Sequence, residues 1–368
     1  MIDLAGPDRR WLDAAARLAR SALGASPGHM AAAALIVDDD LQVLVARGVT
    51  GRSVPFAETQ AVEEARAAAR GRTLYTTIEP TSLWGRTPPS TEAIIKARLG
   101  RVVIGCTQPD PAQSGQGLAR LRAAGIDAHL ADHLPSRQLY AADALSFRLG
   151  RPYVIGKLIV SADGMIGRPD SRSAVPGSLQ TQRFVEMLRA TTDGTMIGAQ
   201  AAKVDDPKLF VRIKGLDNRI YQRFVIVGAR GLDTELNLVA GVSGHPTAII
   251  SVSDREFDVP DAVGIIVADG RNNRPDLRMV MQAITARNVV TLLVEGGARL
   301  VESFLAAELM DRFHLITTDD VIGRGGIPAT MLGGSMAGCG LPDSSRLTSG
   351  RWGPISSAPS NARDDRDE

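Results

Sequence analysis

Residues 292–298 read Leu-Leu-Val-Glu-Gly-Gly-Ala and give the clearest indication of how the second half of the chain folds. The apolar run predicts a buried strand, and the two glycines predict a tight turn into a helix that begins at Ala298. Amide groups and the dipole at the start of a helix favour an anion. Gly296 and Gly297 would let a pyrophosphate approach the backbone closely. The stretch therefore predicts a phosphate site, although a strand-to-helix turn without a ligand has the same pattern.

Strands and helices alternate on both sides of this stretch. In the second half, apolar runs predict strands at residues 153–160, 194–197, 224–227, 248–252, 264–267, 289–294 and 312–317, and helical spacing predicts helices at 180–191, 276–286 and 298–307. In the first half, the same signals predict helices at 9–24, 58–69 and from 90 onward, with strands at 33–37, 41–46, 73–78 and 102–105. This alternation predicts layered α/β domains.

Length and composition limit the organisation and the partners. A chain of 368 residues predicts two domains of ordinary size. A break at Leu149-Gly150-Arg151-Pro152 divides them into residues 1–148 and 149–343, and the Ser-, Pro- and Gly-rich residues 344–368 are expected to be disordered. A net charge of +1 gives no reason to expect nucleic acid or a membrane surface. Two cysteines and the absence of a signal-peptide pattern predict a cytoplasmic protein.

Three stretches of the first half resemble a zinc-deaminase site without its metal ligands: Phe56-Ala57-Glu58, Glu79-Pro80-Thr81-Ser82 and Gly85-Arg86-Thr87-Pro88-Pro89-Ser90. Such a site needs one His, two Cys and a Glu that moves protons. Phe56, Thr81 and Ser90 stand where the ligands would stand, and only Glu58 is retained. Phenylalanine has no donor atom, and neutral hydroxyl groups are poor ligands for zinc. We therefore expect no zinc and no deaminase activity.

These stretches and others resemble the bifunctional deaminase/reductase family of riboflavin biosynthesis, from about residue 10 to about residue 330. The other matching motifs lie at residues 101–105, 108–111, 151–154, 157–158, 161–164, 205–212 and 294–297. The resemblance implies an N-terminal cytidine-deaminase-like three-layer domain and a C-terminal dihydrofolate-reductase-like domain. It also implies NADPH as cofactor, a phosphoribosylated pyrimidine as substrate and a homodimer.

The resemblance also implies roles for individual residues. The family places its phosphate-binding arginines at the positions of Arg189 and Arg212, a bidentate chemistry that suits phosphate. Taken alone, these two side chains would be a solvated helix residue and a charge at a strand end. The remaining implied residues are Ser173, Leu209 and Glu295 for the substrate, Val160, Ala201, Asp205, Gly296 and Gly297 for the cofactor, and Asp205, Lys157 and Glu295 for catalysis. Asp205 also lies in Asp-Asp-Pro, which is a turn signal in its own right.

The chain departs from the family at further positions. Pro27-Gly28-His29-Met30-Ala31-Ala32 replaces the stretch that carries an Asn of the deaminase pocket. Ala201 stands where the family has a cofactor-binding Thr, and Val175 where it often has a Trp. The five histidines show no metal-ligand spacing with the cysteines.

Three functions remain open from the sequence. The first is the NADPH-dependent reduction of the ribosyl group of 5-amino-6-(5-phosphoribosylamino)uracil to the ribitylamino product, with a silent deaminase half. The second is a non-catalytic protein that binds a nucleotide or a partner enzyme. The third is a reductase of a related pyrimidine or pterin.

Overall fold

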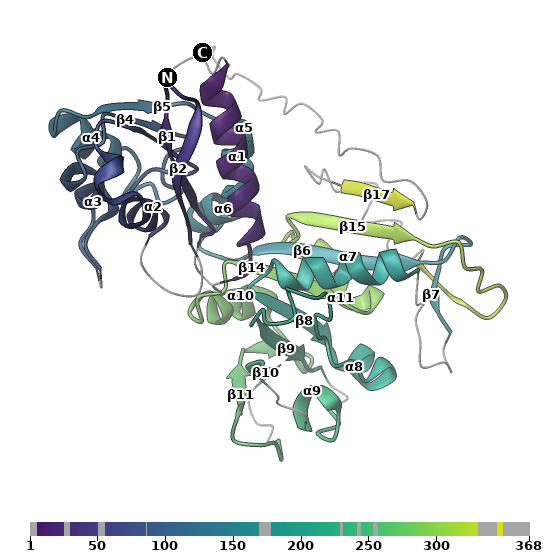
Figure 1. Ribbon diagram of the computed structural model, residues 1–368. Coiled ribbons are helices and arrows are strands. Elements are labelled where there is room, and N and C mark those ends of the chain that lie inside the picture. The colour runs from purple at the N-terminus through teal and green to yellow at the C-terminus, as the bar shows by residue number, and fades with distance from the viewer. Residues whose placement is uncertain are drawn as a thin grey trace, which may run out of the picture.

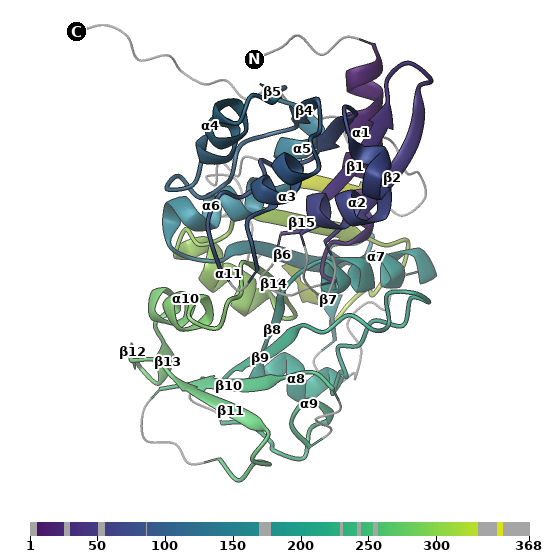
Figure 2. The same cartoon turned by 60° about the vertical axis from the view of Figure 1, so that its left-hand side comes forward.

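The chain forms two lobes in the computed structural model (Figures 1 and 2). The structure describes residues 6–25, 30–50, 56–85, 87–168, 178–228, 231–240, 244–252 and 257–329, and the backbone of residues 344–348. Among the described residues, no helix combines the length and the apolar character that a membrane span needs.

The first lobe is a three-layer α/β domain. Its elements are α1 (Pro7–Ser21), β1 (Ala33–Asp38), β2 (Val43–Val49), α2 (Ala57–Ala65), the 3₁₀ helix η1 (Arg66–Ala69), β3 (Thr73–Thr76), α3 (Ser90–Lys96), β4 (Arg101–Ile104), α4 (Gln116–Ala123), β5 (Asp127–Leu130), α5 (Leu134–Leu139) and α6 (Ala141–Leu149). The strands form one sheet in the order β2-β1-β3-β4-β5. β1 pairs antiparallel with β2 and β3, and β3, β4 and β5 run parallel.

Successive residues of β1 divide this lobe into its layers. Ala34 and Ile36 pack with α2, α3 and α4 on one face of the sheet. Leu35 and Val37 pack with α1 on the other face. Because side chains of a strand alternate between faces, a strand such as β1 that is buried at every residue is covered on both sides. The predicted three-layer architecture is confirmed.

The second lobe is built on a larger parallel sheet. Its elements are β6 (Tyr153–Val160), β7 (Met165–Gly167), α7 (Leu179–Ala190), β8 (Gly194–Gly198), α8 (Ala199–Asp205), β9 (Gln222–Ile226), α9 (Asn237–Ala240), β10 (Thr247–Ser251), β11 (Val263–Val267), β12 (Gly270–Arg271), β13 (Arg274–Pro275), α10 (Leu277–Thr285), β14 (Thr291–Glu295), α11 (Ala298–Ala306), β15 (Arg312–Thr317), β16 (Ile327–Pro328) and β17 (Ser344–Thr348).

The eight strands of the larger sheet lie in the order β11-β10-β9-β8-β14-β6-β15-β17, and each neighbouring pair is parallel. β14 comes late in the chain but lies between β6 and β8. Helices α10 and α11 pack on one face of the sheet, and α8 and α9 pack on the other. Since ligands of open α/β sheets bind beyond the carboxyl ends of the strands, a ligand is expected at the ends of β6, β8 and β14.

The structure extends the second domain beyond its expected end. We expected an unstructured tail from residue 344, but residues 344–348 form β17, which pairs with β15 through the register from Phe313–Ser344 to Thr317–Thr348. The sheet therefore continues past residue 343. Residues 349–368 of the expected tail lie outside the described residues.

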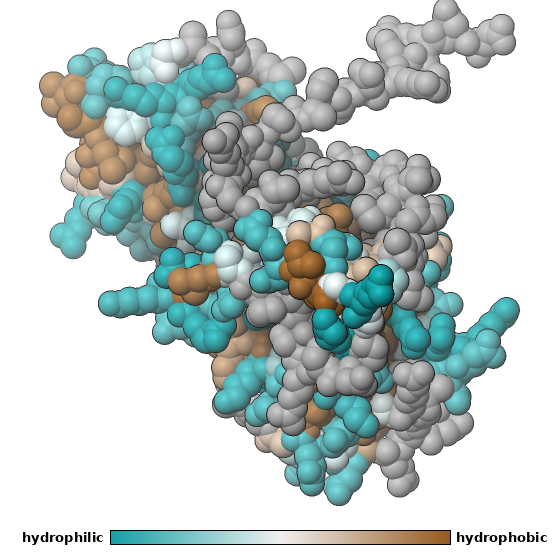
Figure 3. Space-filling model, turned by 90° about the vertical axis from the view of Figure 1, so that its right-hand side faces the viewer, coloured by the Kyte–Doolittle hydropathy of each residue, from teal (hydrophilic) through white to brown (hydrophobic). Residues whose placement is uncertain are grey.

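The two lobes meet at the end of α1. The Arg219 guanidinium donates a hydrogen bond to the backbone carbonyl of Ser21 at 2.8 Å. α6 leads directly into β6, so the chain passes between the lobes near residue 150 (Figure 2). On the face in Figure 3, apolar side chains gather in the upper left part, and hydrophilic side chains are spread among the apolar ones elsewhere.

Candidate active site

Glu295 is the centre of a buried polar cluster at the carboxyl end of β14. The side chain is 2% exposed and lies beside Lys157 of β6, its register partner. Arg189 of α7 donates to both carboxylate oxygens, from Nε to Oε1 at 2.6 Å and from Nη2 to Oε2 at 2.8 Å. Lys157 Nζ lies 3.3 Å from Oε2, and the Thr195 hydroxyl donates to Oε1 at 2.8 Å. Three separate elements thus converge on one carboxylate.

The charges of this cluster are strongly coupled. Burial acts to raise the pKa of Glu295, but Arg189 and Lys157 outweigh burial and hold the pKa below its usual range. Burial also lowers the pKa of Lys157, against the attraction of Glu295 and the smaller attraction of Asp205. Lys157 is therefore an ammonium that gives up its proton more readily than an exposed lysine. Such a group can donate a proton to a bound substrate.

The turn after Glu295 has a backbone that only glycine adopts readily. Gly296 has a φ of 89° and Gly297 a φ of 73°. A Cβ atom at Gly296 would lie 3.0 Å from Ile197 Cγ1 and 3.3 Å from Ala201 Cβ. Gly297 is the N-cap of α11 and has no side chain to cap the helix, so the amide groups of the first turn have no cap from this position. Amide groups at the start of a helix can bind a phosphate group.

The structure brings most of the implied cofactor residues to this turn. Ala201 of α8 adjoins Gly296 and Gly297, and Asp205 ends the same helix. Asp205 was also open to interpretation as a turn residue, but the turn begins one residue later, where Asp206 has a φ of 39°. Val160 is 6% exposed and its side chain belongs to the core, so only its backbone could contact a cofactor.

The two arginines implied for substrate phosphate differ in their surroundings. Arg189 is not a solvated helix residue: its guanidinium is committed to Glu295 and also donates to the Phe210 carbonyl at 3.3 Å. The side chain of Arg212 is 72% exposed and lies 2.7 Å from the buried Glu186. Leu209 is buried, so its backbone is what a substrate could reach. Residues 169–177, with Ser173 and Val175, lie outside the described residues.

The positions that the resemblance implies for metal ligands lie near the starts of two helices. Phe56 is the N-cap of α2, and Ser90 is the first residue of α3, where Pro89 rather than Ser90 is the N-cap. The Thr81 carbonyl accepts a hydrogen bond from the Thr91 amide at 3.2 Å, which places Thr81 beside the start of α3. The three positions that the resemblance implies for metal ligands thus lie at, or next to, the starts of α2 and α3.

Glu58 itself lies in a dry environment. It is 3% exposed and accepts a hydrogen bond from the Thr76 hydroxyl at 2.7 Å. Burial raises the pKa of Glu58, against the hydrogen bond from Thr76 that acts to lower it. A metal ion nearby would favour the charged carboxylate, whereas these surroundings favour the neutral acid.

The residues present do not fit zinc. A phenyl ring and two neutral hydroxyl groups occupy the positions where a deaminase has an imidazole and two thiolates. Over the described parts of the chain, no group of three or more His, Cys, Asp and Glu side chains could hold a metal ion.

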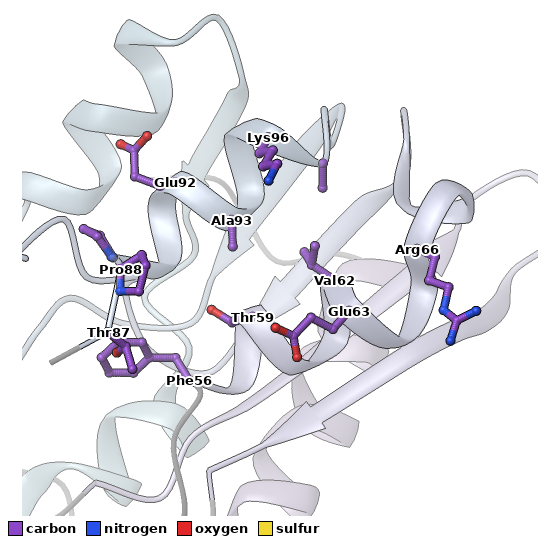
Figure 4. Close-up of a pocket in the computed structure, with 12 residues that line it drawn as sticks. Phe56, Thr59, Val62, Glu63, Arg66, Thr87, Pro88, Glu92, Ala93 and Lys96 are labelled. Atoms are coloured by element: carbon purple, nitrogen blue, oxygen red, sulfur yellow. The ribbon is translucent and has the colours of Figure 1, made fainter.

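A separate pocket of about 710 Å³ lies between α2 and α3 (Figure 4). Its lining is Phe56, Thr59, Val62, Glu63, Arg66, Thr87, Pro88, Pro89, Glu92, Ala93, Lys96 and Ala97. Figure 4 shows the ring of Phe56 beside Thr87 and Pro88 at one end of the pocket. The side chain that replaces the expected histidine is thus part of an apolar surface.

Sequence reasoning did not identify several polar residues around the cluster. Thr195 bonds Glu295, Glu186 holds Arg212, and Tyr221 donates to the Leu209 carbonyl. Arg223 is 0% exposed although it lies in the apolar run of β9. Arg223 could have been identified from the sequence, because a charged residue inside a buried strand needs polar partners. The others carried no signal that distinguishes them from ordinary helix and loop residues.

Comparisons with known proteins agree with the observed fold. Residues 152–347 match the RibD C-terminal domain. A riboflavin biosynthesis protein RibD from Synechocystis sp. is 32% identical over 326 residues, which are 83% of this chain and 83% of that protein. The protein of the same name from Escherichia coli is 29% identical over 280 residues, which are 73% of this chain and 76% of that protein.

Solved structures share the fold over most of the chain. Acinetobacter baumannii RibD, form 1, superposes with a TM-score of 0.77 at 24% identity and covers 88% of this chain and 90% of its own. A diaminohydroxyphosphoribosylaminopyrimidine deaminase/5-amino-6-(5-phosphoribosylamino)uracil reductase from Thermotoga maritima gives a TM-score of 0.77 at 23% identity, with coverage of 88% and 89%. The chain belongs to the RibD family of riboflavin biosynthesis, with a deaminase-like domain followed by a RibD-type reductase domain.

Proposed function

We propose that this chain reduces the ribosyl group of 5-amino-6-(5-phosphoribosylamino)uracil with NADPH, and that its first domain does not deaminate. The observation that carries the proposal is the cluster of Lys157, Arg189 and Glu295 beside the Gly296-Gly297 turn, in a domain of RibD type. The substrate carbon that accepts the hydride and the phosphates of the dinucleotide would thus bind next to each other, at the carboxyl ends of the central strands.

The protein residues supply position and charge for this reaction. NADPH would deliver a hydride to C1 of the ribosyl group. As the bond from C1 to the ring oxygen opens, the ammonium of Lys157 donates a proton to that oxygen. Asp205 stabilises the positive charge of the imine that accepts the hydride. Glu295 keeps Lys157 and Arg189 in place, and Arg212 binds the phosphate of the substrate.

The first domain has a structural role in this proposal. Its sheet and helices are intact, but its former metal positions carry Phe56, Thr81 and Ser90. No step of the reaction is assigned to Glu58, which is buried among hydroxyl groups. The pyrimidine would reach this chain already deaminated by another protein.

One set of assays on the purified chain tests both halves of the proposal. We expect NADPH oxidation with the uracil substrate, no ammonia release from the corresponding diaminopyrimidine, and less than stoichiometric zinc. Oxidation of NADPH should require the phosphorylated uracil. A chain that neither binds NADPH nor reduces this substrate would contradict the reductase function. Ammonia release would contradict the inactivity of the first domain.

A further inference from the structure

The segment of residues 208–212 is held by side chains from outside it. Three successive backbone carbonyls each accept a hydrogen bond from a different side chain. The pairs are Arg223 Nη1 with the Lys208 carbonyl at 3.2 Å, the Tyr221 hydroxyl with the Leu209 carbonyl, and Arg189 Nη1 with the Phe210 carbonyl at 3.3 Å. The Arg212 amide donates to Glu186 at 2.7 Å. The segment is thus fixed at almost every residue.

Leu209 shows why the segment needs this support. Its φ is 51°, in the left-handed region that residues with a side chain rarely adopt, while the side chain itself is 4% exposed. A backbone in this region persists only where its surroundings enforce it, and such positions concentrate at ligand sites. The hydrogen bond from Tyr221 to the Leu209 carbonyl is one such constraint.

Arg223 is an unusual constraint because it is a fully buried cation. The side chain is 0% exposed, and none of the carboxylates in the described part of the chain forms an ion pair with it. It donates to the Thr247 hydroxyl at 3.0 Å and to the His245 carbonyl at 3.3 Å. Its guanidinium lies 5.9 Å from the ring centre of Phe210. Since burying an unpaired charge is costly, a hydrophobic residue would serve packing better.

Tyr221 and Arg223, together with His245, support the segment of residues 208–212 from one side. The His245 ring lies 4.6 Å from the Tyr221 ring and 5.6 Å from the Phe210 ring, measured between ring centres. Tyr221 directly precedes β9 and Arg223 is its second residue, paired with both neighbouring strands, so the sheet fixes their backbone. The segment extends from these supporting side chains to Arg212, whose guanidinium is at the surface.

We propose that Tyr221 and Arg223 are positioning residues that hold residues 208–212 in the conformation that presents Arg212 to the phosphate of the substrate. The inference rests on the proposed reductase function. Neither side chain would touch the reacting atoms. Their effect would be to fix the phosphate-binding arginine before the substrate arrives, which reduces the ordering cost of binding.

Two conservative variants test the inference. Tyr221→Phe removes the hydroxyl and keeps the ring, and Arg223→Lys keeps the charge but not the guanidinium geometry. For each we expect KM of the phosphorylated substrate to rise about three- to tenfold, as for the loss of one hydrogen bond, with kcat and the KM of NADPH nearly unchanged. Reduction of the same substrate without its 5′-phosphate should change by less than twofold, on the order of measurement error.

Tyr140→Phe is the matched control. The Tyr140 hydroxyl is also buried and donates to a backbone carbonyl, that of Ala31 at 3.0 Å, but it lies in the first lobe. Thermal unfolding of all variants separates folding from binding. Competition by inorganic phosphate gives a second measurement, and its inhibition constant should rise in parallel with KM.

The outcomes distinguish the inference from the function on which it rests. A wild-type chain that does not reduce the uracil substrate would contradict both the proposed function and the positioning role. A wild-type chain that is active, with both variants folded and KM for the phosphorylated substrate unchanged, overturns the positioning role alone. Equal loss with the phosphorylated and the dephosphorylated substrate also overturns it, because the defect would then not concern the phosphate.

Discussion

Arg189 and Glu295 are 106 residues apart in the chain, yet the guanidinium of the first donates to both carboxylate oxygens of the second, at 2.6 and 2.8 Å. The Nζ atom of Lys157 lies 3.3 Å from Oε2 of the same carboxylate. One buried anion therefore stabilises two cations whose side chains are only 11% and 15% exposed. Breaking a buried ion pair from one side leaves a charge without compensation, which costs far more than the pair contributes.

The first prediction concerns this anion. In Glu295→Gln the two cations lose their counter-charge, so we expect a loss of about 3 kcal/mol in the free energy of unfolding. Reduction of the substrate should fall at least about a hundredfold, because Lys157 and Arg189 would no longer be held in place. Urea unfolding and NADPH oxidation measure the two effects. Glu302→Gln on α11 is the control, and a Glu295→Gln chain with wild-type stability and activity would contradict the assigned role.

Arg212 allows a direct test of phosphate binding. Its side chain is 72% exposed but pairs with the buried Glu186, so Arg212→Gln should also lower stability, by about 1–3 kcal/mol. KM for the phosphorylated substrate should rise about ten- to a hundredfold, because a charge-assisted bidentate contact is lost. Steady-state kinetics with and without the 5′-phosphate is the measurement. An unchanged ratio between the two substrates would assign the phosphate to another residue.

Parts of the fold could be predicted from local sequence alone. The apolar runs at residues 153–160 and 312–317 predicted β6 and β15 with their observed bounds. The Gly296-Gly297 turn was also recognisable, because glycine adopts a positive φ without strain and leaves room for close packing. Strands and helices of this kind depend mainly on local pattern, which explains the agreement.

The site could be predicted only in part. The resemblance to the family placed Arg189 and Glu295 in one site, but not in contact with each other, since that contact depends on sheet order rather than on sequence spacing. α8 was missed because its first residues follow β8 directly, without a turn signal. The pairing of β17 with β15 was missed because a short polar strand needs a neighbouring edge to form.

Gly296 and Gly297 give a graded pair of variants for the cofactor turn. Both have positive φ, so alanine should cost about 1–2 kcal/mol in unfolding free energy at either position. Only Gly296→Ala also places a Cβ 3.0 Å from Ile197, so it should be the more destabilising change. Both should raise the Kd of NADPH about tenfold or more, measured by fluorescence titration. NADPH affinity equal to wild type in both variants would exclude this turn as the phosphate site.

Glu58 predicts a particular pH dependence of stability. Its pKa in the folded chain is raised above the reference value of 4.5, so the folded state binds the proton more tightly than the unfolded state. The stabilisation is complete below pH 4.5 and is lost as the pH rises through the pKa of the folded state. Glu58→Gln removes this loss. The stability difference between variant and wild type should grow by about 1.4 kcal/mol per pH unit in that window, in favour of the variant.

Urea unfolding at several pH values measures that difference. Glu63→Gln on the exposed side of α2 is the control and should show no such slope. A difference that is constant with pH would mean that Glu58 has the same pKa in the folded and the unfolded chain.

The last prediction concerns the metal positions of the first domain. Phe56 and Ser90 lie at the starts of α2 and α3, and the Thr81 carbonyl accepts a hydrogen bond from Thr91 in the first turn of α3. The triple variant Phe56→His, Thr81→Cys, Ser90→Cys should bind about one zinc ion per chain, because one imidazole and two thiolates complete the donor set of a zinc deaminase. Metal analysis after dialysis measures this, with circular dichroism to confirm folding. Phe56→His alone is the control and should bind much less. If the wild-type chain held as much zinc as the triple variant, the loss of the metal site would be disproved.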